Sequence, residues 1–111
     1  MPLMRGKESN MFVGIFDGWD DVASQYRISK DFPEPKHIYA EYEYENWQGY
    51  STVVFTDDWE TFGVVTGSHC SCYGLEGQWD PSYHSRKEID HIYEKNKEVR
   101  QWLEEAEKVD G

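Results

Sequence analysis

The central 49 residues of this 111-residue chain, positions 37–85, contain no lysine and no arginine. They carry eight of its carboxylates, and they contribute most of its formal net charge of −11. Binding to DNA, RNA or an anionic membrane requires lysine and arginine side chains that displace counterions or meet lipid phosphates. We therefore expect no direct contact with nucleic acid or with a membrane surface.

Cysteines and long apolar runs are also scarce. Only Cys70 and Cys72 are present, and two cysteines separated by one residue cannot build the disulfide framework of a small secreted domain. No apolar run approaches the roughly 20 residues of a membrane-spanning helix, and no signal peptide is recognisable. These absences predict a protein of the cytoplasm.

Aromatic residues, in contrast, are abundant. The chain has five Trp and eight Tyr, whereas disordered chains combine high net charge with few aromatics. We predict one folded domain over residues 11–111, preceded by a polar, flexible N-terminal extension over residues 1–10. The sequence leaves open whether Met1, Met4 or Met11 is the native start.

Hydrophobic periodicity predicts an α+β fold. Residues 37–45 alternate, residues 50–56 are rich in β-branched side chains, and residues 61–66 follow a short turn, which together predict an antiparallel β-meander. A short strand over residues 11–16 and a short helix over residues 20–28 precede it. Ser85 to Glu88 has the spacing of a capping box, and apolar residues at 3–4 spacing predict a helix to about Val109. We expect this C-terminal helix to pack against one face of the small meander.

The alternation within residues 37–45 creates a row of carboxylates. Ile38, Ala40 and Tyr42 share one face, so three glutamates share the other at about 6.6 Å intervals. With the acids of the following turn they predict a partner-binding surface of Glu41, Glu43, Glu45, Asp57, Asp58 and Glu60. Regularly spaced negative charge is also a property of duplex DNA, which suggests DNA mimicry. The alternative is a solvated strand face whose charges discourage edge pairing.

Two tryptophans fall in predicted turns beside these acids. We expect Trp47 and Trp59 to be exposed and to anchor a partner protein, because Trp is enriched at interface hot spots. The alternative is that they close the ends of a small core.

The segment 67–81, GSHCSCYGLEGQWDP, concentrates chemically versatile side chains. His69, Cys70, Cys72 and His84 have the donor types that zinc prefers, although a single residue between cysteines is not the usual spacing of a structural zinc site. A Cys–His nucleophile and a Glu76–Asp80 acid–base pair are further alternatives. The small residues are equally compatible with a tightly packed loop without chemistry.

The same segment resembles a stretch shared by small phage- and prophage-encoded proteins of unassigned function. That stretch has a GSHCSCYGLEGQW(D/E)P-like sequence. The resemblance covers mainly residues 37–85 and transfers no catalytic residue. It implies a viral origin, a bacterial cytoplasm as the place of action, and a role in blocking host defence or host enzymes.

The sequence therefore predicts a non-enzymatic inhibitor without a cofactor. Its expected partner is the basic nucleic-acid-binding surface of a host protein, such as a CRISPR effector, a restriction enzyme or RNA polymerase. A small metal- or thiol-dependent domain centred on the His-Cys-x-Cys loop is the alternative. The sequence identifies neither the target nor the oligomeric state.

Overall fold

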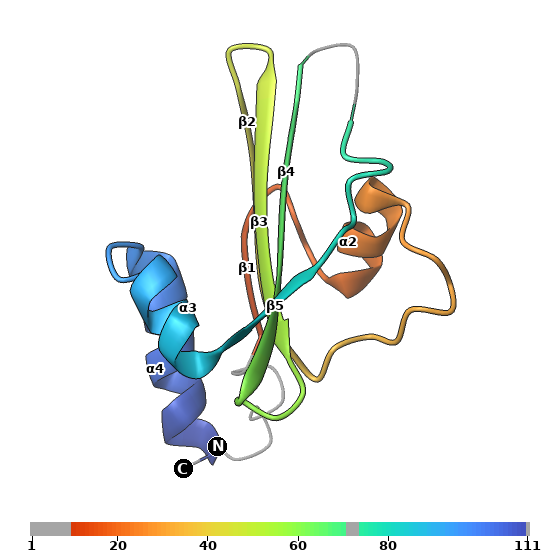
Figure 1. Cartoon of the computed structure of the whole chain (residues 1–111). Helices are drawn as coiled ribbons and strands as arrows, with labels where there is room; N and C mark the ends of the chain where they lie inside the picture. Colours follow the sequence, from red (N-terminus) through yellow and green to blue (C-terminus); the bar gives the residue numbers. More distant parts are fainter. Residues whose placement is uncertain (1–9, 71–73, 111) are drawn as a thin grey trace.

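The fold is a five-stranded sheet with helices on both faces (Figure 1). The computed structural model describes residues 10–70 and 74–110, with side chains up to Glu105. The expected N-terminal extension therefore lies outside the described residues, apart from Asn10. The strands are β1 (Asn10–Gly14), β2 (His37–Glu45), β3 (Gln48–Thr56), β4 (Thr61–His69) and β5 (Ser82–Ser85). The helices are α2 (Trp19–Tyr26), α3 (Arg86–Ile92) and α4 (Lys97–Asp110).

The strands follow one another across the sheet in sequence order. β1 pairs in parallel with β2, and the pairs from β2 to β5 are antiparallel. The predicted α+β class with a β-meander is confirmed. β5 was not predicted, because four residues, SYHS, are too short and polar to produce a strand pattern.

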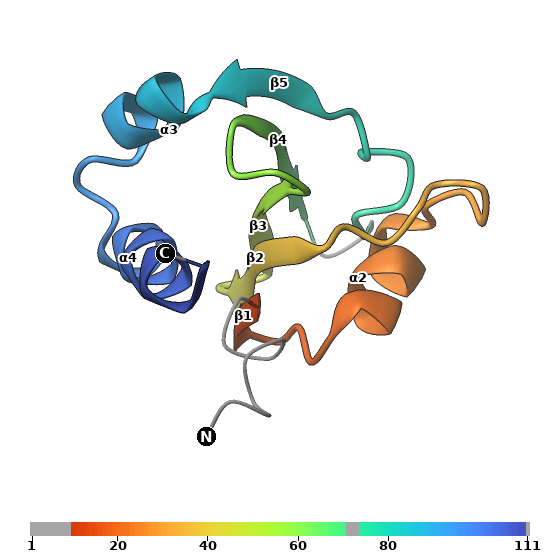
Figure 2. The same cartoon turned by 90° about the horizontal axis from the view of Figure 1, so that it is seen from below.

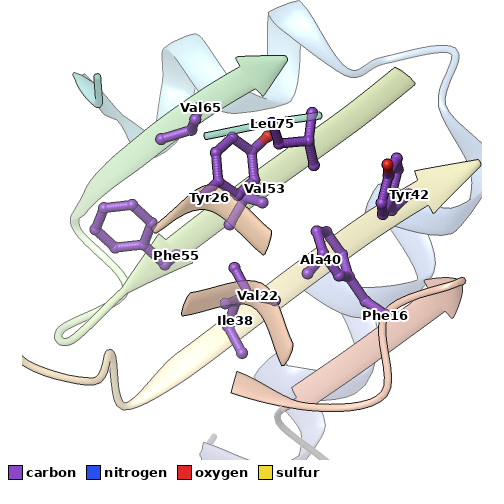
Figure 3. Packing of buried hydrophobic residues seen from close by; sticks show 10 residues of the cluster. All are labelled: Phe16, Val22, Tyr26, Ile38, Ala40, Tyr42, Val53, Phe55, Val65 and Leu75. Atoms are coloured by element: carbon purple, nitrogen blue, oxygen red, sulfur yellow. The ribbon is translucent and has the colours of Figure 1, made fainter. Parts of the chain in front are cut away.

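The sheet is buried on both faces, not on one as the sequence suggested. Figure 2 shows it edge-on between α2 on one side and α3 and α4 on the other. The first face carries the cluster of Figure 3: Phe16, Val22, Tyr26, Ile38, Ala40, Tyr42, Val53, Phe55, Val65 and Leu75. The second face packs Tyr39, Val54 and Phe62 against Ile89, Val99, Trp102 and Leu103.

The prediction of one continuous C-terminal helix is wrong, because the segment forms two helices, α3 and α4. The capping box at Ser85 is present and starts α3, which ends at Ile92. After a turn, the Asn96 side chain accepts a hydrogen bond from the Val99 N–H at 3.0 Å and so caps α4. Asn competes for backbone hydrogen bonds and favours caps over helix interiors, which explains the break.

The helices cover only part of the sheet. β5 pairs with Thr61–Val64 alone, and β1 pairs with β2 only as far as Tyr42. The β2–β3 hairpin therefore projects beyond all three helices, as Figure 1 shows at the top of the view. In the part of the chain that the structure describes, no helix is long and apolar enough to cross a membrane.

Candidate functional site

The projecting hairpin ends in a two-residue turn, Asn46-Trp47. Glu45 pairs directly with Gln48, and both turn residues have positive φ, 54° and 67°. Positive φ at both central residues is the pattern of a type I′ turn, in which glycine is favoured at the second position. Here that position is a Trp that is 74% exposed. Placing a bulky L-residue in the left-handed region costs about 1–2 kcal/mol.

Large apolar side chains gather around this turn. Tyr44, Trp47 and Tyr50 are exposed on the hairpin, and Ile15 is exposed where its N–H donates to the Tyr42 carbonyl at 2.8 Å. These are four of the six large hydrophobic side chains that are exposed among the described residues; the others are Tyr83 and Ile92. Their concentration at one end of the sheet indicates a patch suited to contact another molecule.

Two carboxylates flank the same aromatics. Glu43 lies opposite Tyr50 across the hairpin, and Glu45 lies opposite Gln48. Both glutamates are exposed, and no Lys or Arg of the described residues is within ion-pair distance of either. Arg86 of α3 and Arg100 of α4 each form an ion pair with Asp90 at 3.0 Å. We call Glu43, Tyr44, Glu45, Trp47 and Tyr50 the hairpin tip.

Glu41, the third glutamate of the predicted row, has a different environment. It is half-buried, and it accepts a hydrogen bond of 2.6 Å from the Tyr39 hydroxyl. Burial raises the pKa of that hydroxyl well above its usual range, and the Glu41 carboxylate raises it further. Glu41 therefore contributes to packing between the sheet and the C-terminal helices as well as to the surface charge.

The predicted continuous row of six acids is wrong. The β3–β4 turn that holds Asp57, Asp58 and Glu60 lies at the opposite end of β3 from the hairpin tip, about 26 Å away along the strand. Asp58 accepts from the N–H groups of Glu60 and Thr61 at 2.9 Å, which holds its pKa below the usual value. Asp57 accepts from the Lys36 N–H at 2.8 Å. Asp58 therefore shapes its own turn, and Asp57 ties that turn to the segment before β2.

Trp59 is not an exposed anchor. Its ring centroid lies 5.2 Å from that of Trp102 and 4.6 Å from that of His37, and it packs against the second core cluster. Like Trp47 it has a positive φ, 62°, but the packing of its ring compensates the strain. Only the expectation of exposure at Trp47 is confirmed.

The four ligands of the alternative metal site do not come together. Phe62 pairs with His84, so His84 lies about 23 Å along β4 from His69. Cys70 is exposed, and Cys72 lies outside the described residues. Within the described ranges, no three His, Cys, Asp or Glu side chains are placed to hold a metal ion.

Both ring nitrogens of His69 are already engaged. Nδ1 lies 2.8 Å from the Cys70 carbonyl, and because a carbonyl only accepts, Nδ1 carries the hydrogen of the neutral ring. Nε2 then accepts from the Tyr42 hydroxyl at 2.6 Å. The ring lies against Gly49, where a side chain would collide with it. His69 thus ties the end of β4 to β2.

The remaining described part of segment 67–81 covers the first face of the sheet. Leu75 is fully buried, and the Trp79 ring stacks on Phe55 with centroids 5.7 Å apart. The Gln78 side chain accepts from the Ser68 N–H and donates to the Ser68 carbonyl, at 3.0 and 2.8 Å. Sequence reasoning missed these roles; the spacing of Leu75, Gln78 and Trp79, at three and four residues, was the only available signal.

Sequence reasoning also missed Tyr44 and Tyr50. The predicted segments, residues 37–45 and 50–56, left four residues between them, so Tyr50 began a strand whose register with the preceding one was not defined. The shorter turn sets the register that brings Tyr50 opposite Glu43. Asn46 alone did not indicate a two-residue turn, because the residue that follows it is Trp47 and not glycine.

Comparison of the chain with protein-family models, with curated proteins and with solved structures finds no match. The interpretation of the hairpin tip therefore rests on its geometry and charge.

Proposed function

We propose that this chain is a non-enzymatic binding protein that docks its hairpin tip onto the basic nucleic-acid-binding surface of another protein and blocks that surface. A CRISPR effector, a restriction enzyme and RNA polymerase are candidate partners. The observation that carries the proposal is Trp47, a bulky exposed side chain in a strained turn position at the end of a projecting hairpin. Strained residues cluster at functional sites, because their cost must be offset elsewhere.

Among the described residues, no packing contact comparable to that of Trp59 offsets the strain at Trp47. Its ring is largely in solvent, whereas the equally strained Trp59 is packed against Trp102. Glycine in the same position would avoid the strain. A tryptophan there is explained if burial against a partner supplies the missing stabilisation, since Trp is a frequent hot-spot residue.

The charge of the hairpin tip favours a cationic partner. Glu43 and Glu45 lie beside three exposed aromatic rings in a segment that has no Lys or Arg of its own. Charges of one sign steer an oppositely charged partner during association, and this effect weakens as salt screens it. Arginine-rich surfaces that bind nucleic acid provide this complementarity together with affinity for aromatic rings.

The geometry supports insertion of a hairpin more than imitation of a DNA strand. Glu41, Glu43 and Glu45 span about 13 Å, whereas duplex DNA carries about eight phosphate charges over that length. The acids of the β3–β4 turn do not extend the row. The hairpin tip would instead occupy one position in a basic groove, with Trp47 at the leading end.

The resemblance of residues 67–81 to phage-encoded proteins fits this proposal. A phage protein acting in a bacterial cytoplasm would gain from blocking host proteins that bind nucleic acid. The described residues of this segment support the fold, so the blocking activity is assigned to the hairpin tip.

The test compares the wild-type chain with Trp47→Gly and with Glu43→Gln/Glu45→Gln. Purified RNA polymerase, a CRISPR effector and a restriction enzyme serve as binding probes, and Kd is measured by biolayer interferometry at several salt concentrations. We expect at least one probe to bind the wild type, in competition with duplex DNA. Either variant should weaken that binding at least about tenfold. The double glutamine variant should also reduce the salt dependence of Kd.

Glu60→Gln/Glu104→Gln is the matched control, because it removes two exposed carboxylates far from the hairpin tip. Its Kd should stay close to that of the wild type. If it weakens binding as strongly as the variants of the hairpin tip, the partner responds to overall charge and the proposed site is wrong. Unchanged binding of Trp47→Gly would also contradict the proposal.

A further inference from the structure

A concave feature lies at the other end of the sheet from the hairpin tip. It is a cavity of about 190 Å³ lined by Phe55, Thr56, Asp57, Asp58, Thr61, Gly63 and Tyr83. This volume is below that of a typical small-molecule site and is suited to a single side chain.

Strand register explains how the cavity forms. Phe55, Gly63 and Tyr83 are paired in one row across β3, β4 and β5, so all three lie on the same face of the sheet. Gly63 has no side chain, and the Phe55 ring lies over it, where a Cβ atom would collide with the ring. The Phe55 ring therefore covers the backbone at Gly63 and forms the floor of the cavity, and Tyr83 stands at its side.

The aromatic wall is held on one side and exposed on the other. Phe55 stacks on Trp79 and meets Phe32 edge-on, with centroids 5.7 and 5.9 Å apart. Tyr83 stands perpendicular to Phe55 at 6.2 Å and remains 59% exposed. Tyr83 belongs to neither core cluster among the described residues, so its position gives the core little stabilisation.

The rim of the cavity is anionic. Asp57 and Asp58 are exposed on the turn that closes it, and no described Lys or Arg lies within ion-pair distance of either carboxylate. Asp58 is fixed in orientation by the N–H groups of Glu60 and Thr61. Aromatic walls below oriented carboxylates match a planar cation, because guanidinium stacks on rings and forms paired hydrogen bonds with carboxylates.

We propose that this cavity accepts one arginine side chain of a partner protein. The aliphatic part of the side chain would lie on the Phe55 ring and beside the Tyr83 ring. The guanidinium would reach Asp57 and Asp58 at the rim. This site is separate from the hairpin tip and does not depend on the function proposed for it.

The test is an NMR titration of the 15N-labelled full chain with N-acetyl-arginine-N′-methylamide. Amide shifts should concentrate at Thr61, Gly63 and Tyr83. Tyr83→Ala and Asp57→Asn should each weaken binding about fivefold, and Tyr83→Phe should retain it. The corresponding lysine derivative should bind more weakly, because ammonium lacks the planar fork.

Two controls separate this site from general charge and from the hairpin tip. Glu60→Gln removes a carboxylate of the same turn that does not line the cavity, and Glu43→Gln/Glu45→Gln alters the hairpin tip; both should leave the titration unchanged. Equal binding of the lysine derivative would overturn the assignment. So would binding that Tyr83→Ala does not weaken, provided its spectrum shows an intact fold, or shifts confined to the hairpin tip.

Discussion

At the residue scale, the two tryptophans with positive φ show how one backbone conformation serves two purposes. Trp59 turns the chain between β3 and β4 and places its ring against Trp102. Trp47 turns the chain between β2 and β3 and leaves its ring in solvent. The backbone cost is similar at both positions, but among the described residues only the Trp59 ring is packed well enough to offset it. Substitution by glycine should therefore have opposite effects at the two sites.

We expect Trp47→Gly to raise the free energy of unfolding by about 1 kcal/mol, because glycine adopts the left-handed conformation without strain. Trp59→Gly should lower it by about 3 kcal/mol, since the packing of a large ring is lost. Urea denaturation followed by circular dichroism measures both. A destabilised Trp47→Gly variant would show that the exposed ring has a stabilising role.

At the element scale, the break between α3 and α4 matters more than either helix alone. α3 starts at a complete capping box and contributes Ile89 to the second core cluster. The turn at Tyr93–Asn96 then allows α4 to approach the sheet at a new angle, with Val99, Trp102 and Leu103 buried. A continuous helix would not bring both segments onto the face of Tyr39, Val54 and Phe62.

Asn96→Ala should destabilise the protein by about 1 kcal/mol, because the Val99 N–H at the start of α4 loses its cap. Asn96→Asp should retain most of the stability, as aspartate also caps helices. Thermal denaturation of the two variants against wild type gives the comparison. Equal stability of Asn96→Ala and wild type would mean that water caps the helix equally well.

The elements that the sequence predicted well are those with a clear period. The alternation of β2 correctly assigned Ile38 and Ala40 to the face opposite the glutamates. The length of the β2–β3 turn could not be predicted. A two-residue turn is normally recognised by a glycine at its second position, and here that position holds Trp47. The packing of Leu75 and Trp79 against the first face of the sheet was missed. Their segment has no hydrophobic periodicity, so nothing in its pattern marks these single residues as buried. The separation of Asp57 from Glu45 was already implicit in the predicted meander, because the two turns stand at opposite ends of one strand.

At the scale of the whole molecule, one thin sheet holds two cores that contain buried tyrosines. Burial raises the pKa of Tyr26 to about 12, and it raises the pKa values of Tyr39, Tyr42 and Tyr93 as well. An unfolded tyrosine loses its proton near pH 10. Above that pH the unfolded chain binds fewer protons than the folded one, so stability decreases as pH rises.

We expect full stability below pH 10 and a decrease between pH 10 and pH 12, with Tyr26 contributing about 1.4 kcal/mol per pH unit. Tyr26→Phe also loses the 2.7 Å hydrogen bond to Ser51, which lowers stability at every pH, but it should flatten the alkaline decrease. Guanidinium denaturation at pH 8, 10 and 11 measures the slope. Identical slopes for the two proteins would contradict this account.

The contact between Gln78 and Ser68 has a consequence for self-association. β4 continues past the end of β5 from Val65 to His69, and this stretch would offer its backbone to any other extended chain. The Gln78 amide fills one position of that vacant edge by imitating both hydrogen bonds of a neighbouring strand. The Gln78 side chain thereby occupies backbone hydrogen-bonding groups through which β4 could otherwise pair edge to edge with a strand of a second molecule.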